Sequence, residues 1–194
     1  FVPTCRLWNT ERVDRPDDWP WPDFDPVATA DERATLVHFL DDQRASFRAI
    51  SDGLTAEQMA RRSVEPSEMS LLGLVRHLAG VEHGWFGTVM QGFDSARPFA
   101  TTDDPDADFE DAIGDDQQVR QAWDEWHRQI ALANRFVDDA PDLDVTGIEK
   151  WRGPMSLRWV LLHMIEEYAQ HNGHADLLRE RIDGHVRGDP MHDN

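Results

Sequence analysis

Cysteine is almost missing from this sequence, since Cys5 is the only one in 194 residues. A single cysteine excludes a disulfide within the chain and favours a reducing compartment, so we expect a cytoplasmic protein. Long apolar runs are missing too, because none approaches the ~20 residues that a membrane-spanning helix needs. No signal peptide is recognisable either, and we therefore expect no membrane partner.

Basic residues are also scarce. The chain carries 19 Lys and Arg against 38 Asp and Glu, which gives a net charge of −19 with histidine neutral. A surface with this charge repels nucleic acids and anionic membranes, so we exclude both as partners. Solubility explains the excess of acidic residues, and a chain of this length can bury one hydrophobic core.

The residues that are present divide the chain into three parts. Residues 1–28 are dense in proline, aspartate and tryptophan, and we predict an irregular extension whose aromatic side chains lie against the rest of the protein. Residues 29–184 are predicted to form a single domain. Residues 185–194 are predicted to form a polar, frayed tail.

Two helices are predicted in the first half of that domain. A capping box that begins at Thr29 opens the first helix, which runs to about residue 52. Its buried stripe is predicted to consist of Leu36, Phe39, Leu40, Phe47 and Ile50. A short turn capped by Thr55 and Gln58 follows, and Ser70 caps a second long helix that ends at Gly92.

An acidic segment, residues 93–116, separates the second helix from a third. It is predicted to be a solvated, mobile loop. The third helix is predicted over residues 117–138, and Pro141 prevents its continuation. Because no convincing alternating strand pattern appears, the sequence predicts an all-α four-helix bundle with long inter-helix loops.

The fourth predicted helix, Met155 to Gly184, carries the most informative pattern. Ser156 can cap its start, and Gly184 suits the left-handed position that ends many helices. Within it His163, Glu167 and His171 recur at intervals of four and therefore form one stripe. Imidazole and carboxylate groups spaced one turn apart can hold a single metal ion.

A third candidate ligand lies on the second helix. The segments SLLGLVRH (70–77) and SLRWVLLH (156–163) match in cap, apolar positions and final histidine, which suggests related places in the bundle and brings His77 near the fourth helix. His77, Glu167 and His171 would then form a three-ligand site that suits catalytic zinc, with non-haem iron and nickel as alternatives. The alternative for His77 is a hydrogen-bonded core histidine without a metal.

The remaining histidines are assigned lesser roles. His163 could be a fourth ligand, and His174 could orient a ligand or the substrate. Glu82 and His83 are interpreted as surface or inter-helix contacts, while Gly173, costly inside a helix by about 1 kcal/mol, suggests close approach of another helix or a ligand. The histidines without a partner pattern are His38, His127, His185 and His192.

The segments LLGLVRHLAGVEHGWF and SLRWVLLHMIEEYAQHNGHADLLRERIDG together resemble the DinB-like superfamily of metal-binding four-helix bundles. The likeness extends from about residue 30 to residue 184 and is closest to the actinobacterial branch of mycothiol-dependent S-transferases and maleylpyruvate isomerase. It implies that His77 is the ligand on the second helix and that Glu167 and His171 are the pair on the last one. Many relatives have histidine where this chain has Glu167 and glutamine where it has His174; the glutamate variant resembles the isomerase branch.

The resemblance also implies an activity. A divalent metal, with zinc expected, would activate mycothiol for transfer to a small electrophile. We expect the protein to be a monomer or a homodimer. No further catalytic residue is identified; Arg76 and Arg158 are candidates for contacts to the thiol, although surface arginines are the simpler interpretation. The alternatives are a metal-dependent hydrolase that uses the same ligands and a non-enzymatic helical module whose histidines are structural.

Overall fold

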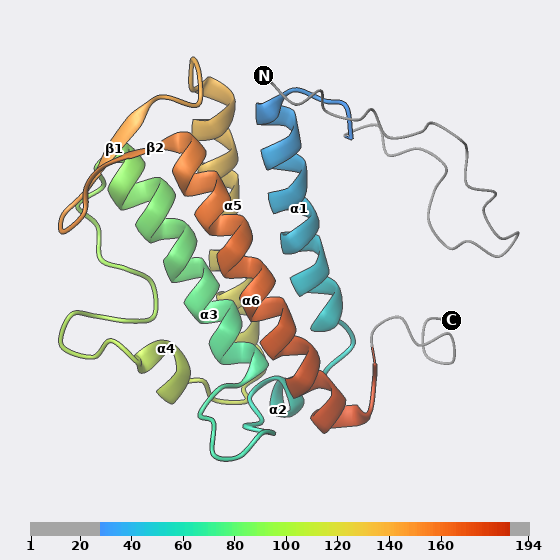
Figure 1. Cartoon of the computed structure of the whole chain (residues 1–194). Coiled ribbons are helices and arrows are strands. Elements are labelled where there is room, and N and C mark those ends of the chain that lie inside the picture. Colours follow the sequence, from blue (N-terminus) through green and yellow to red (C-terminus); the bar gives the residue numbers. More distant parts are fainter. Residues whose placement is uncertain (1–27, 187–194) are drawn as a thin grey trace, which may run out of the picture.

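The structure, a computed structural model, describes residues 28–186 (Figure 1). Four long helices form a bundle: α1 (Glu32–Ile50), α3 (Leu71–Glu82), α5 (Asp116–Asp139) and α6 (Leu157–Asp183). α1 packs against α6, and α3 packs against both α5 and α6. The predicted all-α bundle is confirmed, whereas the predictions for the N-terminal extension, Cys5 and most of the polar tail lie outside the described residues.

The ends of the helices follow local capping chemistry. Ser70 and Ser156 each accept a hydrogen bond from a backbone N–H three residues further on, as predicted for α3 and α6. α6 ends at Gly184, whose φ of 82° lies in the left-handed region. The predicted capping box at Thr55 is present and opens the short helix α2 (Ala56–Met59). None of the helices within residues 28–186 combines the length and apolar character that crossing a bilayer requires.

α1 departs from its prediction in two respects. Asp31, not Thr29, is the N-cap, because its carboxylate accepts a hydrogen bond from the N–H of Ala34 directly at the start of the helix. Phe39 is 50% exposed, so it is not part of the buried stripe. Arg44 is buried on α1 instead, because it pairs with the buried carboxylate of Glu82 on α3.

The second predicted helix changes its winding before it ends. α3 continues as a π-helix, η1 (His83–Met90), and Gly92 follows with a φ of 71°. An unpredicted antiparallel hairpin of β1 (Thr146–Glu149) and β2 (Gly153–Ser156) packs on η1. Gly147 allows this contact, since a Cβ there would lie 2.1 Å from the carbonyl oxygen of Val89. Strands of four residues that contain glycine and proline are too short to give an alternating pattern.

The acidic segment 93–116 is not simply a solvated loop. It contains a short helix, α4 (Ala107–Glu110), which packs against α3. Ala107 and Asp108 are both buried there, so the prediction of a solvated connection is wrong for this part of the segment. The local composition concealed the contact, because 9 of the 24 residues in the segment are acidic and its apolar residues follow no helical period.

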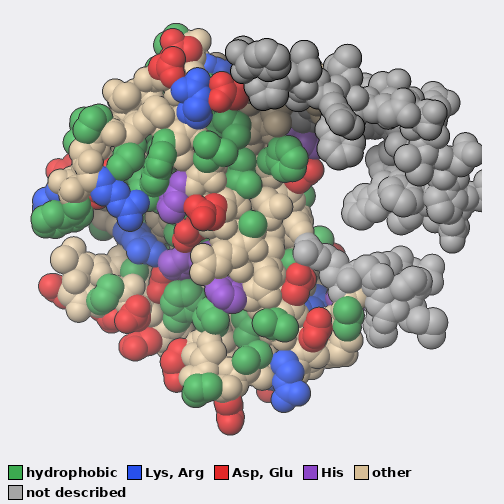
Figure 2. All heavy atoms as spheres, viewed as in Figure 1, with side chains coloured by type: hydrophobic (Ala, Val, Ile, Leu, Met, Phe, Trp, Pro, Cys, Tyr) green, Lys and Arg blue, Asp and Glu red, His purple; other side chains and the backbone are tan. Residues whose placement is uncertain are grey.

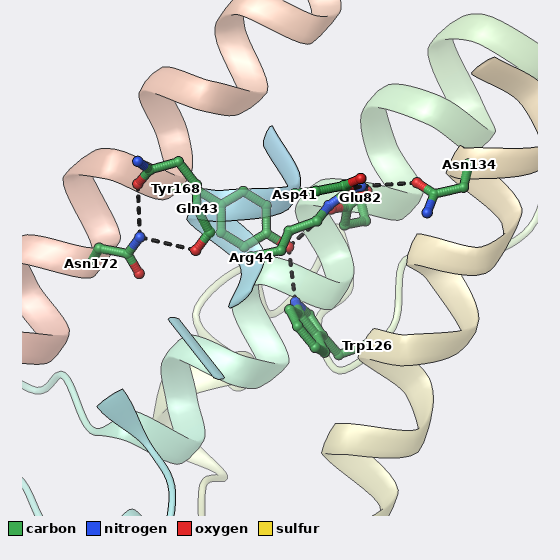
Figure 3. Close-up of polar contacts among 8 residues, drawn as sticks. All are labelled: Asp41, Gln43, Arg44, Glu82, Trp126, Asn134, Tyr168 and Asn172. Atoms are coloured by element: carbon green, nitrogen blue, oxygen red, sulfur yellow. Dashed lines mark hydrogen bonds and ion pairs between the residues drawn. The ribbon is translucent and has the colours of Figure 1, made fainter. Parts of the chain in front are cut away.

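A buried polar network joins the four long helices (Figure 3). Arg44 of α1 donates two hydrogen bonds of 2.8 Å to the carboxylate of Glu82 on α3. The hydroxyl of Tyr168 on α6 donates to the same carboxylate and accepts a hydrogen bond from Trp126 on α5. Glu82 is therefore an inter-helix contact and not a surface residue, and the network fixes the orientation of α6 one residue away from Glu167.

Gly173 is exposed on the surface of α6. A Cβ added there would meet no other atom within 4 Å. Close approach of another helix, one of the two explanations predicted for Gly173, is therefore wrong, and close approach of a ligand stays a prediction.

Candidate metal centre

The structure brings His77, Glu167 and His171 together from α3 and α6. The Nε2 atom of His77 lies 3.7 Å from Glu167 Oε1, and the Nε2 atom of His171 lies 3.5 Å from the same oxygen. One candidate ligand atom from each of the three residues lies within 4.8 Å of the other two. Two ligand atoms that bind one tetrahedral ion at ~2.1 Å are about 3.4 Å apart, so this set of donors fits a single divalent metal ion.

Electrostatics keep the carboxylate of this cluster ionised. The imidazoles of His171 and His77 beside the carboxylate lower the pKa of Glu167 far below its usual value, although partial burial opposes the shift. Burial lowers the pKa of His77, but the neighbouring carboxylates of Asp108 and Glu167 outweigh it and leave that pKa raised. An ionised carboxylate between two imidazoles is therefore available to a cation over the neutral pH range.

His163 and His174 flank the cluster without entering it. The ring of His163 stacks on that of Trp159 and meets Trp85 edge-on, and its Nε2 atom lies 3.9 Å from Glu167 Oε2. The Nδ1 atom of His174 lies 3.4 Å from the Nδ1 atom of His171. A fourth ligand at His163 and an orienting role for His174 stay predictions.

Asp108, which the sequence did not indicate as part of the site, contacts His77 from the side opposite to Glu167. Asp108 of α4 places Oδ2 2.9 Å from His77 Nδ1, and its side chain is 2% exposed. Arg97 lies 3.0 Å from the same oxygen. No spacing rule links positions 77 and 108, so only the packing of α4 on α3 reveals this carboxylate.

A cavity of about 580 Å³ lies beside the cluster, along the turns of α3 and η1 that follow His77. Arg97 lines it and also approaches His77, while Trp85 lines it and contacts His163. Across from them the hairpin contributes Trp151 and Arg152. Figure 2 shows this face, where histidine, acidic and basic side chains gather over α3 and α6 beside a hollow.

The two arginines that the sequence suggested for thiol binding lie elsewhere. Arg76 is buried, not on the surface, and donates hydrogen bonds of 2.8 Å to the carbonyl oxygens of Ala107 and Asp111. Arg158 pairs with Glu32 and Asp144 near the start of α6. Both side chains therefore have structural partners, and neither lines the cavity beside the cluster.

Comparison with known proteins identifies a family and a fold. A family model described as mycothiol S-transferase matches residues 35–184. No curated protein matches the sequence. The fold is similar to that in a crystal structure of a conserved protein from Enterococcus faecalis, with a TM-score of 0.55 and 16% identity over 78% of this chain and 96% of that one. At this identity the likeness concerns the fold alone.

Proposed function

The chain belongs to the mycothiol S-transferase family, and on that premise we propose that it is a metal-dependent enzyme that transfers a low-molecular-weight thiol to a small electrophile. The thiol is mycothiol and the reaction takes place in the cytoplasm. One observation carries the proposal: an imidazole of α3 converges with a carboxylate and an imidazole of α6, within 4.8 Å of one another.

The cluster provides the ligands for the metal. His77, Glu167 and His171 would hold one divalent ion, with zinc expected and nickel or iron as alternatives. When bound there, the ion supplies Lewis acidity that lowers the pKa of a thiol. Three protein ligands leave a position open to a substrate, and partial burial of the three side chains limits competition from water.

The neighbouring cavity would receive the reacting molecules. Its volume of about 580 Å³ is in the range of small-molecule sites. Trp85 and Trp151 offer aromatic surfaces, whereas Arg97 and Arg152 offer positive charge for polar groups of a substrate. In the transfer the thiol releases its proton to solvent, its sulfur forms a bond to the electrophilic carbon, and the leaving group departs with the electron pair of the broken bond.

Metal analysis tests the first half of this proposal. Protein purified without an affinity tag should contain close to one metal ion per chain. His171→Ala should abolish binding and leave the helical circular dichroism largely unchanged, whereas His127→Ala, which alters an exposed histidine of α5, should retain the metal. Metal-free wild-type protein that cannot be reloaded would contradict the proposal and favour the non-enzymatic helical module.

A thiol-dependence assay tests the second half. Metal-loaded protein is incubated with a model electrophile, with and without mycothiol, and the thioether product is quantified. We expect product only when mycothiol and the metal are both present. Turnover of the electrophile without thiol would contradict transfer and favour the metal-dependent hydrolase.

A further inference from the structure

Asp108 differs from every other acidic residue in the loop before α5. The acidic side chains at positions 103, 104, 106, 110 and 111 are exposed, whereas Asp108 is buried. Burying a carboxylate is costly unless it is paired or hydrogen-bonded. A buried carboxylate in a segment whose other acidic side chains are exposed therefore requires an explanation in terms of what it contacts.

Three features hold α4 in the place that this contact requires. Gly73 of α3 leaves room for Phe109, since a Cβ at this glycine would lie 2.7 Å from the Phe109 ring. The Phe109 ring packs on the ring of His77 with a centroid distance of 5.3 Å. Arg76 binds carbonyl oxygens at both ends of α4. The position of Asp108 is therefore built by α3 and does not result from a chance approach of the loop.

The geometry at Asp108 specifies the state of His77. An ionised carboxylate can only accept, so the 2.9 Å contact requires a proton on His77 Nδ1. Arg97 lies farther from Nδ1, at 3.3 Å, and donates to the same Asp108 oxygen at 3.0 Å. The second oxygen, Oδ1, is buried and has no hydrogen-bond partner among residues 28–186. A neutral His77 with its proton on Nδ1 presents the lone pair of Nε2 toward Glu167 and His171.

We propose that Asp108 is a positioning residue of the metal centre, which holds His77 in the Nδ1–H tautomer and aims Nε2 at the point shared with Glu167 and His171. The inference rests on the proposed function, because that point is where the metal would bind. Carboxylates that accept a hydrogen bond from a ligating histidine fix the orientation of its ring and increase its basicity as a ligand. Asp108 does both from a helix that supplies no ligand itself.

The tautomer is measured first, in the metal-free wild-type chain. Long-range ¹H–¹⁵N correlation spectra distinguish protonated from unprotonated ring nitrogens, and loss of one signal set in His77→Gln assigns His77. Above the titration midpoint of His77, located in the same spectra, we expect Nδ1 protonated and Nε2 unprotonated. A proton on Nε2 instead would overturn the proposal without any variant of Asp108.

Metal affinity is measured next, by competition with a chromophoric chelator. Asp108→Asn keeps the size of the side chain and removes its charge, and we expect an affinity about 10- to 100-fold weaker than that of the wild type. Asp106→Asn makes the same chemical change at an exposed position two residues away, and its affinity should equal that of the wild type. Equal affinities in the two variants would refute the role of Asp108.

The two measurements separate this inference from the proposed function. A wild-type chain that binds no metal refutes the proposed function, yet the tautomer of His77 still tests the contact with Asp108. The Co²⁺-loaded protein gives a third readout, since a changed ligand geometry alters its visible absorption bands. We expect a shifted spectrum for Asp108→Asn and an unshifted one for Asp106→Asn; unshifted bands in both would count against positioning.

Discussion

Replacing Glu82 by leucine tests the charged network at the centre of the bundle. The Glu82 side chain is fully buried and accepts both hydrogen bonds of a bidentate pair from Arg44, whose own side chain is 5% exposed. Burial by itself lowers the pKa of Arg44, but the Glu82 carboxylate outweighs it and leaves the pKa raised. A guanidinium is not deprotonated in a protein at neutral pH, so Arg44 stays charged when Glu82 is removed. Asp41 and Asn134 are then its remaining hydrogen-bond partners.

The expected cost follows from a buried charge that loses its bidentate partner and keeps only the half-exposed carboxylate of Asp41. Breaking a buried ion pair by removing one partner costs about 3–5 kcal/mol, because the other charge is left desolvated. In the double variant Arg44→Met/Glu82→Leu no such charge remains. In this double variant the Tyr168 hydroxyl loses the acceptor that lies 2.9 Å away, and we expect this loss to lower the free energy of unfolding by about 1–2 kcal/mol relative to the wild type. The double variant should thus be more stable than Glu82→Leu alone.

Urea denaturation followed by circular dichroism gives the free energy of unfolding of each variant. Glu180→Leu serves as the control, because this glutamate of α6 is exposed and its replacement should change stability by less than about 0.5 kcal/mol. A double variant that is no more stable than Glu82→Leu would refute the reasoning. It would mean that the network stabilises the bundle through attraction within the pair, and not through the cost of leaving a charge alone.

Three other substitutions have defined outcomes. Gly173→Ala should stabilise the protein by up to about 1 kcal/mol, since an added Cβ meets nothing within 4 Å in a helix interior; a lower thermal midpoint would contradict this. Gly147→Ala should destabilise the protein by about 1–3 kcal/mol or more, because the new Cβ would lie 2.1 Å from a backbone oxygen of η1. Unchanged urea unfolding would show that the hairpin does not pack there. Glu125→Gln should lose at most about 1 kcal/mol at pH 7. Hydrogen bonds from Arg128 lower the pKa of Glu125 below its usual 4.5, so the stability is present above that pH and is lost as the pH falls through the lowered value. The difference from wild type should therefore shrink at pH 3, and an equal difference at both pH values would exclude this origin.

Much of the helical architecture could be predicted because capping and periodicity are local. Ser70, Ser156 and Gly184 bound their helices as predicted, since each satisfies backbone groups within one turn of itself. The error at Thr29 has the same origin: two capping side chains lie within three residues, and Asp31 is better placed. The hairpin was not predictable, because its four-residue strands are too short for an alternating pattern and its contact with η1 joins segments far apart in the chain.

In the candidate site, too, the features that depend on local spacing were predictable and those that depend on packing were not. The sequence by itself determined that Glu167 and His171 share one face of α6, because a spacing of four residues fixes that geometry within any helix. The short likeness between residues 70–77 and 156–163 also suggested that His77 lies near that face, and the structure brings the three side chains together.

Only the tertiary structure decided what surrounds those three side chains. Asp108 is one acidic residue among many in an acidic segment, and nothing in its neighbouring residues distinguishes it from the exposed ones. Glu82 lies one turn from the apolar residues Leu78 and Phe86, but its partner Arg44 is on a different helix and cannot be found from local sequence. Asp108 is buried because Gly73 and Arg76 hold α4 against α3. Glu82 is buried because Arg44 meets it from α1. Burial and pairing are properties of contacts between segments far apart in the chain, so they are settled by how the helices pack.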